Sequence, residues 1–194
     1  MRYEVDIEGV GEMMQNRCSK DLIDEQNKIP RGKGYSEAKE KWEEENWNKK
    51  LNHEVIDGKQ EVVWTMFTVR AFLIQCSKKS SIACPKSVGK TWTSYIESCV
   101  LPESSIIKYK KLYPKGMMVN GNPSAKGGSS KVYKIRPCMS GWTCKLVFVD
   151  TMDMLDKDIV ETLITKGGLY IGLSDYRPLF GRFSVKKITA IKGL

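Results

Sequence analysis

The segment between residues 166 and 185, KGGLYIGLSDYRPLFGRFSV, concentrates residue types that suit the binding of an anion. Glycine lets a backbone approach a ligand closely and adopt positive φ angles, and the permanent charges of Arg177 and Arg182 suit planar or phosphate-bearing groups. The segment therefore predicts phosphate recognition and not bond making. A glycine-rich turn whose arginines are simply solvated is the alternative that the local sequence leaves open.

Other basic residues extend this hypothesis. Lys78 and Lys79 close a predicted helix, where they could contact a ligand or only stabilise the negative helix end. The strips at 108–113 and 131–137 interleave rings with cations, which can pair phosphates with stacked bases, but lysines that protect edge strands are the alternative. The candidate nucleic-acid-binding residues are Gly167, Gly168, Gly172, Tyr176, Arg177, Gly181, Arg182, Lys78, Lys79, Lys131, Lys134 and Arg136.

The sequence offers little support for catalysis, and we expect a protein that is not an enzyme. Its single histidine, His53, has no sequence-adjacent Ser, Cys or Lys arrangement of the kind that marks an activated nucleophile. A metal-independent endoribonuclease that uses His53 as acid or base is the enzyme alternative. The cysteine and aspartate spacings match neither a zinc site nor a calcium loop, so we expect no metal and no cofactor.

Composition constrains the elements that must position these residues. A chain of 194 residues, of which 41% are hydrophobic, can bury a sizeable core and is most simply one domain. Its apolar runs fall far short of the roughly 20 residues that span a bilayer, and its first residues lack the apolar block of a signal peptide. We therefore expect a cytoplasmic protein with reduced cysteines and no membrane partner.

The charges are distributed unevenly along the chain. Residues 1–61 carry 11 Lys/Arg against 15 Asp/Glu, a balance of −4, whereas residues 62–194 carry 21 against 8, a balance of +13, which together give the net +9. A basic block of this size raises the local concentration of anions and is typical of a nucleic-acid binder. A solvated basic surface without a ligand is the alternative.

Hydrophobic patterns predict an ordered series of strands and helices. Residues 2–8 alternate as a half-buried strand, and residues 64–79 and 155–165 carry helical spacing. We expect Gly167 and Gly168 to form a left-handed cap after the second helix. Further strands are predicted at 106–113, 131–136, 143–149 and 182–191.

Two segments interrupt this series. Residues 19–61 are highly charged, and we interpret them as an insertion after the first strand that contains a short helix within 36–50. Residues 119–130, VNGNPSAKGGSS, are rich in turn formers and predict a long hairpin connection. The expected organisation is a single domain, residues 1–194, with the charged insertion at 19–61.

The order strand, helix, strands, helix, strand predicts an α+β fold. It corresponds to the ferredoxin-like or RNA-recognition-motif topology, an antiparallel sheet with two helices on one face. The helical face is needed for the core, so the open face and its loops are free for a ligand. The strand LVFVD at 146–150 does not match the aromatic pattern of an ordinary RNA-recognition motif, so base stacking on the sheet is not supported.

A ferredoxin-like unit whose last strand follows a glycine-rich loop with embedded arginine resembles the repeat-associated mysterious protein superfamily, the RNA-binding subunits of CRISPR effector complexes. DIEGVGEMM at 6–14 and TMFTVRAFLIQC at 65–76 resemble the opening and the first helix of that family. The last part of this sequence is also similar to the endings of short proteins encoded by phages and prophages. Leu173 and Ser174 depart from the family, where a further glycine is expected. The resemblance implies backbone contacts for Gly167, Gly168, Gly172, Arg177, Gly181 and Arg182.

Together these observations predict a protein that binds single-stranded nucleic acid, preferably RNA, without catalysis. The resemblance implies that it acts as a subunit of a larger assembly, through self-assembly or a protein partner. A second hypothesis is a phage-encoded interaction or inhibitor protein that mimics a host complex and uses the acidic insertion as its contact surface. The endoribonuclease is the third.

Overall fold

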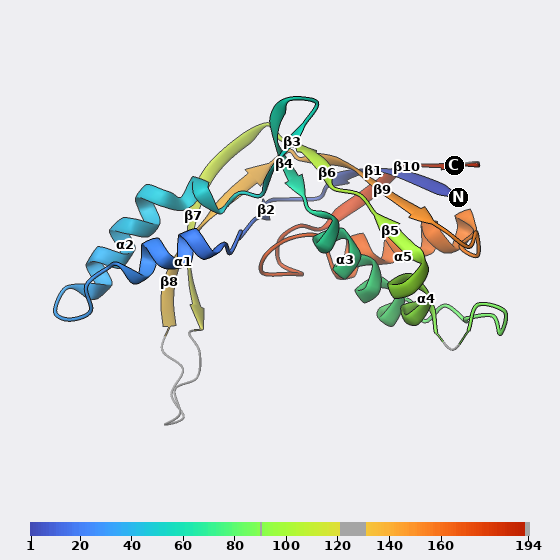
Figure 1. Cartoon of the computed structure of the whole chain (residues 1–194), viewed down its shortest axis with the longest axis horizontal. Helices are drawn as coiled ribbons and strands as arrows, with labels where there is room; N and C mark the ends of the chain where they lie inside the picture. The colour runs from blue at the N-terminus through green and yellow to red at the C-terminus, as the bar shows by residue number, and fades with distance from the viewer. Residues whose placement is uncertain (90, 121–130, 193–194) are drawn as a thin grey trace, which may run out of the picture. The chain divides into compact units, whose positions relative to one another are not determined.

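The computed structural model describes residues 1–89, 91–120 and 131–192, with side chains for all of these except 119, 120, 131 and 132 (Figure 1). The chain divides into two compact units, which are described separately below. The first unit comprises Met1–Met14, Asn52–Lys111 and Met139–Leu194, and the second comprises Gln15–Leu51 and Leu112–Cys138.

The predicted insertion at 19–61 does not coincide with either unit. Residues 19–51 belong to the second unit, but residues 52–61 belong to the first, where they contribute to a hairpin. The second unit also includes residues 112–138, which the sequence patterns assigned to the body of the fold. The expectation that the chain is a single domain stays a prediction.

The first unit is built on a mostly antiparallel sheet. Its strand order is β10-β1-β9-β6-β4-β3, and β5 pairs with β9 beside this path. The two-residue strand β2 (Met13–Met14) belongs to a different sheet. The strands are β1 (Arg2–Gly9), β3 (His53–Ile56), β4 (Lys59–Trp64), β5 (Val100–Pro102), β6 (Ser105–Lys108), β9 (Thr143–Asp150) and β10 (Phe183–Ile191).

Three α-helices belong to the first unit, and a side chain caps the start of each. Thr65 accepts a hydrogen bond from the Thr68 amide at 3.3 Å before α3 (Met66–Lys79). Thr91 accepts from the Ser94 amide at 3.1 Å before α4 (Trp92–Cys99). Asp156 accepts from the Ile159 amide at 2.8 Å before α5 (Lys157–Tyr170). Such caps satisfy amides that lack a partner inside the helix. The predicted helices at 64–79 and 155–165 are confirmed as α3 and α5, whereas α4 was not predicted.

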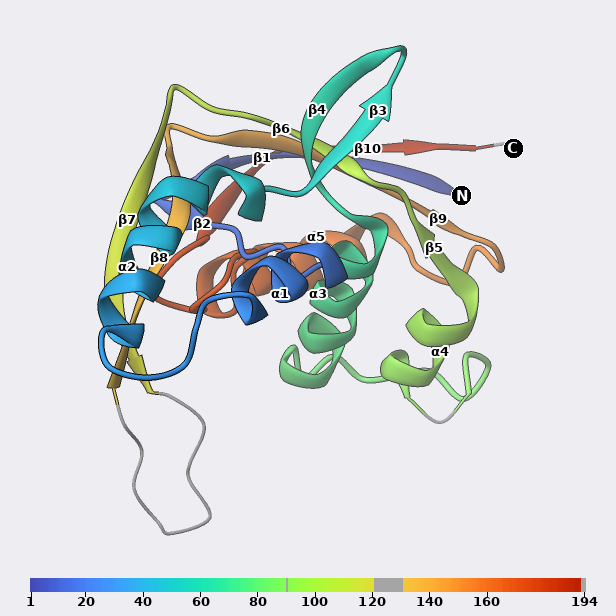
Figure 2. The same cartoon turned by 60° about the vertical axis from the view of Figure 1, so that its left-hand side comes forward.

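The core lies between this sheet and the helices α3 and α5. Strand β1 pairs antiparallel with β10 on one side and β9 on the other, and its Tyr3, Val5 and Ile7 are buried as the alternating pattern predicts. Figure 2 shows α3 and α5 on the same side of the sheet. Tyr3 stacks on Phe148 with ring centroids 5.4 Å apart. The predicted α+β class is therefore confirmed.

Gly167 and Gly168 do not cap α5, so this part of the sequence prediction was wrong. The helix continues through both residues to Tyr170, and both are buried. A Cβ atom on Gly167 would clash with Cys76 of α3, and a Cβ on Gly168 would lie 2.5 Å from the carbonyl oxygen of Phe183 in β10. The two glycines are therefore needed for close packing of α5 against a helix and a strand.

Replacing Gly168 by alanine tests this packing. Alanine favours the helix by about 1 kcal/mol, but its methyl group would meet the β10 backbone, which cannot rotate away. We expect Gly168→Ala to lower the free energy of unfolding by about 2 kcal/mol, measured by urea denaturation. The exposed helix variant Thr165→Ala is the control and should unfold like the wild type. A Gly168→Ala protein of unchanged or higher stability would contradict the assignment.

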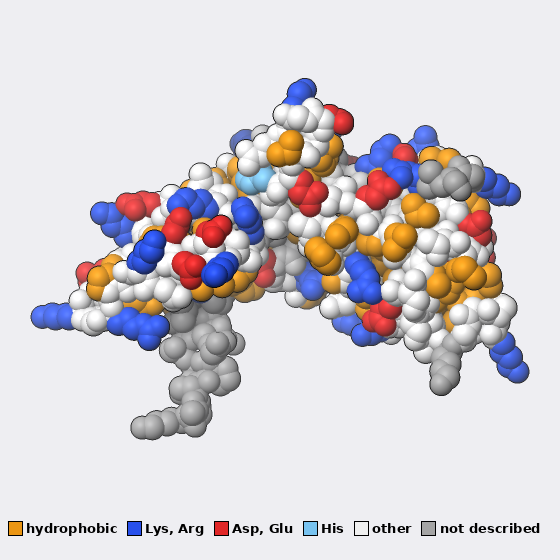
Figure 3. Space-filling view, viewed as in Figure 1, with side chains coloured by type: hydrophobic (Ala, Val, Ile, Leu, Met, Phe, Trp, Pro, Cys, Tyr) orange, Lys and Arg blue, Asp and Glu red, His pale blue; other side chains and the backbone are white. Residues whose placement is uncertain are grey.

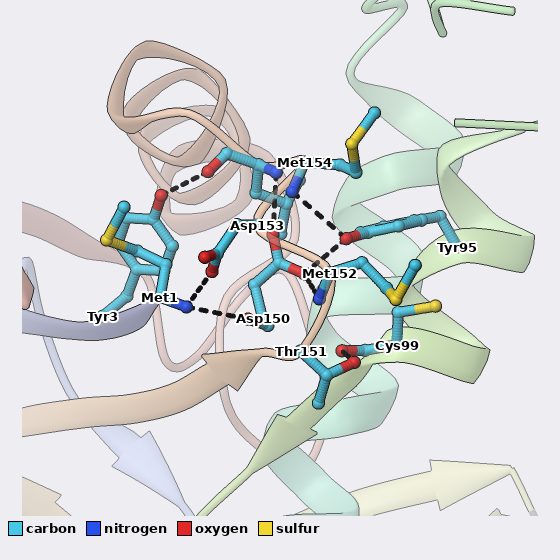
Figure 4. Close-up of polar contacts among 10 residues, drawn as sticks. Met1, Tyr3, Tyr95, Cys99, Asp150, Thr151, Met152, Asp153 and Met154 are labelled. Carbon is cyan, nitrogen blue, oxygen red and sulfur yellow. Dashed lines mark hydrogen bonds and ion pairs between the residues drawn. The ribbon is translucent and has the colours of Figure 1, made fainter. Parts of the chain in front are cut away.

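Asp150, at the end of β9, organises the turn that leads into α5 (Figure 4). Its carboxylate is fully buried and accepts hydrogen bonds from the Tyr95 hydroxyl, the Met152 amide at 3.2 Å and the Leu155 amide at 2.8 Å. Burial raises the pKa of Tyr95, and the hydrogen bond to Asp150 raises it further. The carboxylate thus supplies acceptors for backbone amides that would otherwise be unpaired.

The second unit combines helices with a hairpin. The predicted short helix within 36–50 is confirmed as α2, and strands β7 and β8 are hydrogen-bonded neighbours. The predicted hairpin connection at 119–130 lies largely outside the described residues. No helix of the described ranges is long and apolar enough to cross a membrane. The elements of this unit are α1 (Lys20–Asn27), α2 (Tyr35–Asn46), the 3-10 helix η1 (Trp47–Lys50), and most of β7 (Lys111–Asn120) and β8 (Lys131–Ser140).

Candidate nucleic-acid interface

The loop between α5 and β10, residues 171–182, is called the glycine–arginine loop. Gly172 and Gly181 have φ angles of 75° and 76°, as the glycine pattern predicts. The Leu173 amide donates to the Gly181 carbonyl at 2.8 Å and closes the base of the loop. A Cβ on Gly172 would lie 2.8 Å from that same carbonyl oxygen. Both glycines are therefore required by the local backbone.

Main-chain hydrogen bonds also fix the loop against residues 10–14. The Gly181 amide donates to the Glu12 carbonyl at 2.9 Å, and the Asp175 amide donates to the Met14 carbonyl at 3.0 Å. Ser174 accepts from the Met14 amide at 2.8 Å through its hydroxyl. Ser174 and Leu173 are the residues at which the sequence departs from the resembled glycine pattern, and the Ser174 hydroxyl helps to hold the loop.

The loop presents its cations to solvent. Arg177 and Arg182 are both exposed, and Arg182 Nε donates to the Pro178 carbonyl at 2.9 Å. Within the described part of the chain, neither arginine forms an ion pair. Tyr176 is half-buried and has a φ of 59°. The loop therefore holds two guanidinium groups on a backbone that is already ordered before any ligand binds.

Three of the other predicted residues, Lys78, Lys79 and Gly167, line a separate cavity. Lys78 and Lys79 are exposed in the last turn of α3, and the cavity has a volume of about 380 Å³. Burial raises the pKa of the Cys76 thiol in the same lining, and the positive charge of Arg177 opposes that shift.

Lys134 and Arg136 are engaged elsewhere, in a charge cluster inside the second unit. They lie 3.7 and 3.8 Å from the carboxylate of Glu43, which is 1% exposed. Glu43 also accepts from Lys50 and from the Ile135 amide at 3.1 Å. This arrangement gives the two predicted cations a structural partner, whereas the side chain of Lys131 lies outside the described residues.

Glu43 is held in its charged form. Burial on its own would raise the pKa of this carboxyl, but the hydrogen bond and charge of Lys50, the Ile135 amide and Lys134 outweigh it and lower the pKa. A carboxyl with a lowered folded-state pKa contributes stability that is present above its ordinary pKa of about 4.3. The contribution of Glu43 to stability is lost as the pH falls through its lowered folded-state pKa.

We therefore expect Glu43→Gln to destabilise the protein by about 3 kcal/mol at neutral pH, since it leaves buried cations without their anion. The deficit should shrink under strongly acidic conditions, where the wild-type carboxyl is itself protonated. Urea unfolding followed across this pH range measures both effects. Glu45→Gln, on the same helix and 61% exposed, is the matched control and should change little. A deficit that is independent of pH would contradict the electrostatic explanation.

A larger cavity, of about 760 Å³, lies on the open face of the first unit's sheet, on the side away from α3 and α5. Two of its three lysines, Lys145 and Lys186, are paired with carboxylates, and the third is the exposed Lys108. Lys145 binds Glu4 at 2.9 Å, and Lys186 binds Glu8 at 2.6 Å. Carboxylates therefore offset most of the positive charge in this cavity.

His53, the residue of the enzyme alternative, opens β3 and pairs with Val62 of β4 in the hairpin register. It is half-buried. In the described ranges, no three His, Cys, Asp or Glu side chains come together in a way that could hold a metal ion.

No protein-family model matches the sequence, and no curated protein matches it. Solved structures do match. A chain of the Type IV-B CRISPR complex has a TM-score of 0.52 at 9% identity, with 100% of this chain and 92% of that chain covered. A chain of the Type III-B Cmr-beta complex bound to cognate target RNA has a TM-score of 0.49 at 11% identity, with 97% of this chain covered.

This chain spans 60% of the matched Cmr-beta chain. A chain of a CRISPR RNA-guided surveillance complex matches with a TM-score of 0.39 at 11% identity, with 95% of this chain and 67% of that chain covered. The protein therefore shares its fold with the Type IV-B CRISPR complex chain. This agrees with the expected likeness to subunits of CRISPR effector complexes at the level of the fold.

Proposed function

We propose that the protein binds single-stranded RNA, without cleaving it, as one subunit of a larger assembly. The glycine–arginine loop carries the proposal, because its backbone is fixed by hydrogen bonds while Arg177 and Arg182 stay exposed. A site that is ordered before binding avoids the entropic cost of ordering. Guanidinium groups match the geometry of phosphate oxygens and keep their charge at any physiological pH.

The proposed fold of the first unit is an elaborated ferredoxin-like core. Strands β10, β1, β9 and β5 follow one another in pairing order, and α3 and α5 cover one face. In this view α4, the β3–β4 hairpin, β6 and the whole second unit are additions to a common core. The likeness in fold to a chain of a CRISPR complex supports a role as a subunit.

The distribution of charge supports an anionic ligand. The basic balance of +13 falls in residues 62–194, which include the glycine–arginine loop. By contrast, basic and acidic side chains are interspersed over α1 and α2 in the second unit (Figure 3). The preference for RNA over DNA rests on the resemblance of the loop to RNA-binding subunits of CRISPR complexes.

Removal of both loop cations should weaken RNA binding and reduce its dependence on salt. Each lost phosphate contact lowers the slope of log affinity against log salt by about 0.7 for a single strand, so Arg177→Ala/Arg182→Ala should lose about 1.4. Fluorescence anisotropy with a labelled oligouridylate, titrated at several salt concentrations, measures the slope. The melting temperature should stay within a few degrees of the wild type, because both side chains are exposed.

The variant Lys157→Ala/Lys187→Ala removes the same charge from exposed positions outside the loop and serves as the control. It should retain the wild-type slope to within experimental error. An arginine variant that behaves like this control would show that the loop does not bind the backbone. Absence of salt-sensitive binding by the wild type at low ionic strength would refute the function itself.

The protein should leave RNA intact. We expect labelled RNA incubated with the protein to remain at full length, with and without a chelator, because the fold gives His53 a place in a hairpin and no neighbouring nucleophile is indicated by the sequence. Gel electrophoresis of the RNA measures this. Cleavage by the wild type that disappears in His53→Ala would contradict a non-catalytic role.

A further inference from the structure

The cavity at the C-terminal ends of α3 and α5 has the composition of an anion site. It is called the lysine pocket, and its volume of about 380 Å³ falls in the range of small-molecule sites. Three of its lining residues are lysines, and none of the described residues that line it is an aspartate or a glutamate. Its polar and aromatic lining residues include Lys78, Lys79, Ser81, Lys166 and Tyr170.

The three lysines are exposed, and none forms an ion pair with another of the described residues. Lys166 Nζ donates to the carbonyl of Ser80, the residue that caps the end of α3, at 2.9 Å. This bond draws a cation from α5 to the end of α3, where Lys78 and Lys79 already lie. An ammonium group has three donors, so Lys166 can bind Ser80 and an anion together.

Stabilisation of the helix ends does not account for this amount of charge. Both α3 and α5 end at the pocket, and each helix C-terminus carries about −0.5 of an elementary charge. The two ends amount to about −1, against three full positive charges on the lysines. Burial raises the pKa of Cys76 in the wall of the pocket, and the positive charge of Arg177 opposes that shift.

Tyr170 gives the pocket an aromatic component. It is the last residue of α5 and 69% exposed, so its ring has an open surface at the edge of the site. A base can stack on such a ring while a phosphate lies among cations, which is how aromatic and basic residues combine in nucleotide recognition. Ser81 adds an exposed side chain with a hydroxyl donor.

We infer that the lysine pocket binds the phosphate group of a nucleotide, with Lys78, Lys79 and Lys166 as cationic ligands and Tyr170 beside the base. The nucleotide is either free or part of the RNA chain, and both share the same chemistry. The inference rests on the proposed function, since it adds a second phosphate-binding point next to the glycine–arginine loop. It also identifies Lys166 as a binding residue that the sequence analysis did not select.

The test compares two probes, uridine 5′-monophosphate and a labelled oligouridylate that lacks a terminal phosphate. Lys78→Ala/Lys79→Ala is the main variant, because neither side chain forms a hydrogen bond or ion pair with another of the described residues. We expect it to lose about tenfold in affinity for at least one probe, and about 1.4 in the salt slope if the probe is the oligouridylate. Lys166→Met is a second variant and should weaken the same probe.

The response of the two probes identifies the source of the phosphate. Weakened binding of the monophosphate indicates a free nucleotide, whereas weakened binding of the oligouridylate alone indicates the RNA backbone. The control Lys157→Ala/Lys187→Ala should leave both affinities unchanged. If neither probe responds to the pocket variants, or if the control weakens binding equally, the inference is overturned.

The failure of this inference can be told apart from the failure of the proposed function. If the oligouridylate binds through Arg177 and Arg182 but no probe responds to the pocket variants, the function stands and the pocket inference falls. If the oligouridylate does not bind the wild type at all, the function falls, and the monophosphate titration still decides whether the pocket takes a phosphate.

Discussion

The close approach of α5 to both α3 and β10 is the constraint on which the candidate site depends. Gly167 contacts α3 and Gly168 contacts β10, and neither position has room for a Cβ atom. This packing brings the end of α5 against the end of α3, which assembles the lysine pocket. It also determines where the chain leaves α5 to form the glycine–arginine loop. The close packing at these two glycines thus positions the residues of the lysine pocket and of the glycine–arginine loop.

Some cations of the chain lie beside carboxylates, whereas others are exposed and have no ion-pair partner among the described residues. Lys50, Lys134 and Arg136 surround the buried Glu43 inside the second unit, and Lys145 and Lys186 bind carboxylates on the open face of the sheet. Carboxylates compensate Lys145 and Lys186, and the three cations that share the single Glu43 have largely buried side chains, so both groups offer less attraction for a polyanion than exposed, unpaired cations. The arginines of the loop and the lysines of the pocket are exposed instead, and this difference gives the proposed function its location.

Patterns that depend on neighbours in sequence predicted much of the fold. The alternation of Tyr3, Val5 and Ile7 identified β1, and the glycines at 172 and 181 have the positive φ angles expected of them. The β3–β4 hairpin was missed although its signal was present, since Asp57-Gly58 is a typical two-residue turn with positive φ at both positions. The high charge of the surrounding segment obscured it.

Features that depend on distant contacts could not be predicted. Gly167-Gly168 is an ordinary helix-ending signal, and only the contacts with Cys76 and Phe183 explain why the helix continues. Glu43 lies in a run of charged residues that looks solvated, but it is buried and accepts a hydrogen bond from the Ile135 amide, 92 positions away in the sequence. The lysine pocket depends in the same way on a bond between Lys166 and Ser80, 86 positions apart.

The central claim is that RNA lies along the glycine–arginine loop and the neighbouring end of α5. Photocrosslinking of the wild-type protein to RNA that contains 4-thiouridine, followed by mass spectrometry of the crosslinked peptides, tests this claim most directly. The account predicts crosslinks concentrated in residues 166–182, with Tyr170 and Tyr176 as the nearest aromatic acceptors. Crosslinks confined to residues 15–51 or to the open face of the sheet, with none in 166–182, would contradict it.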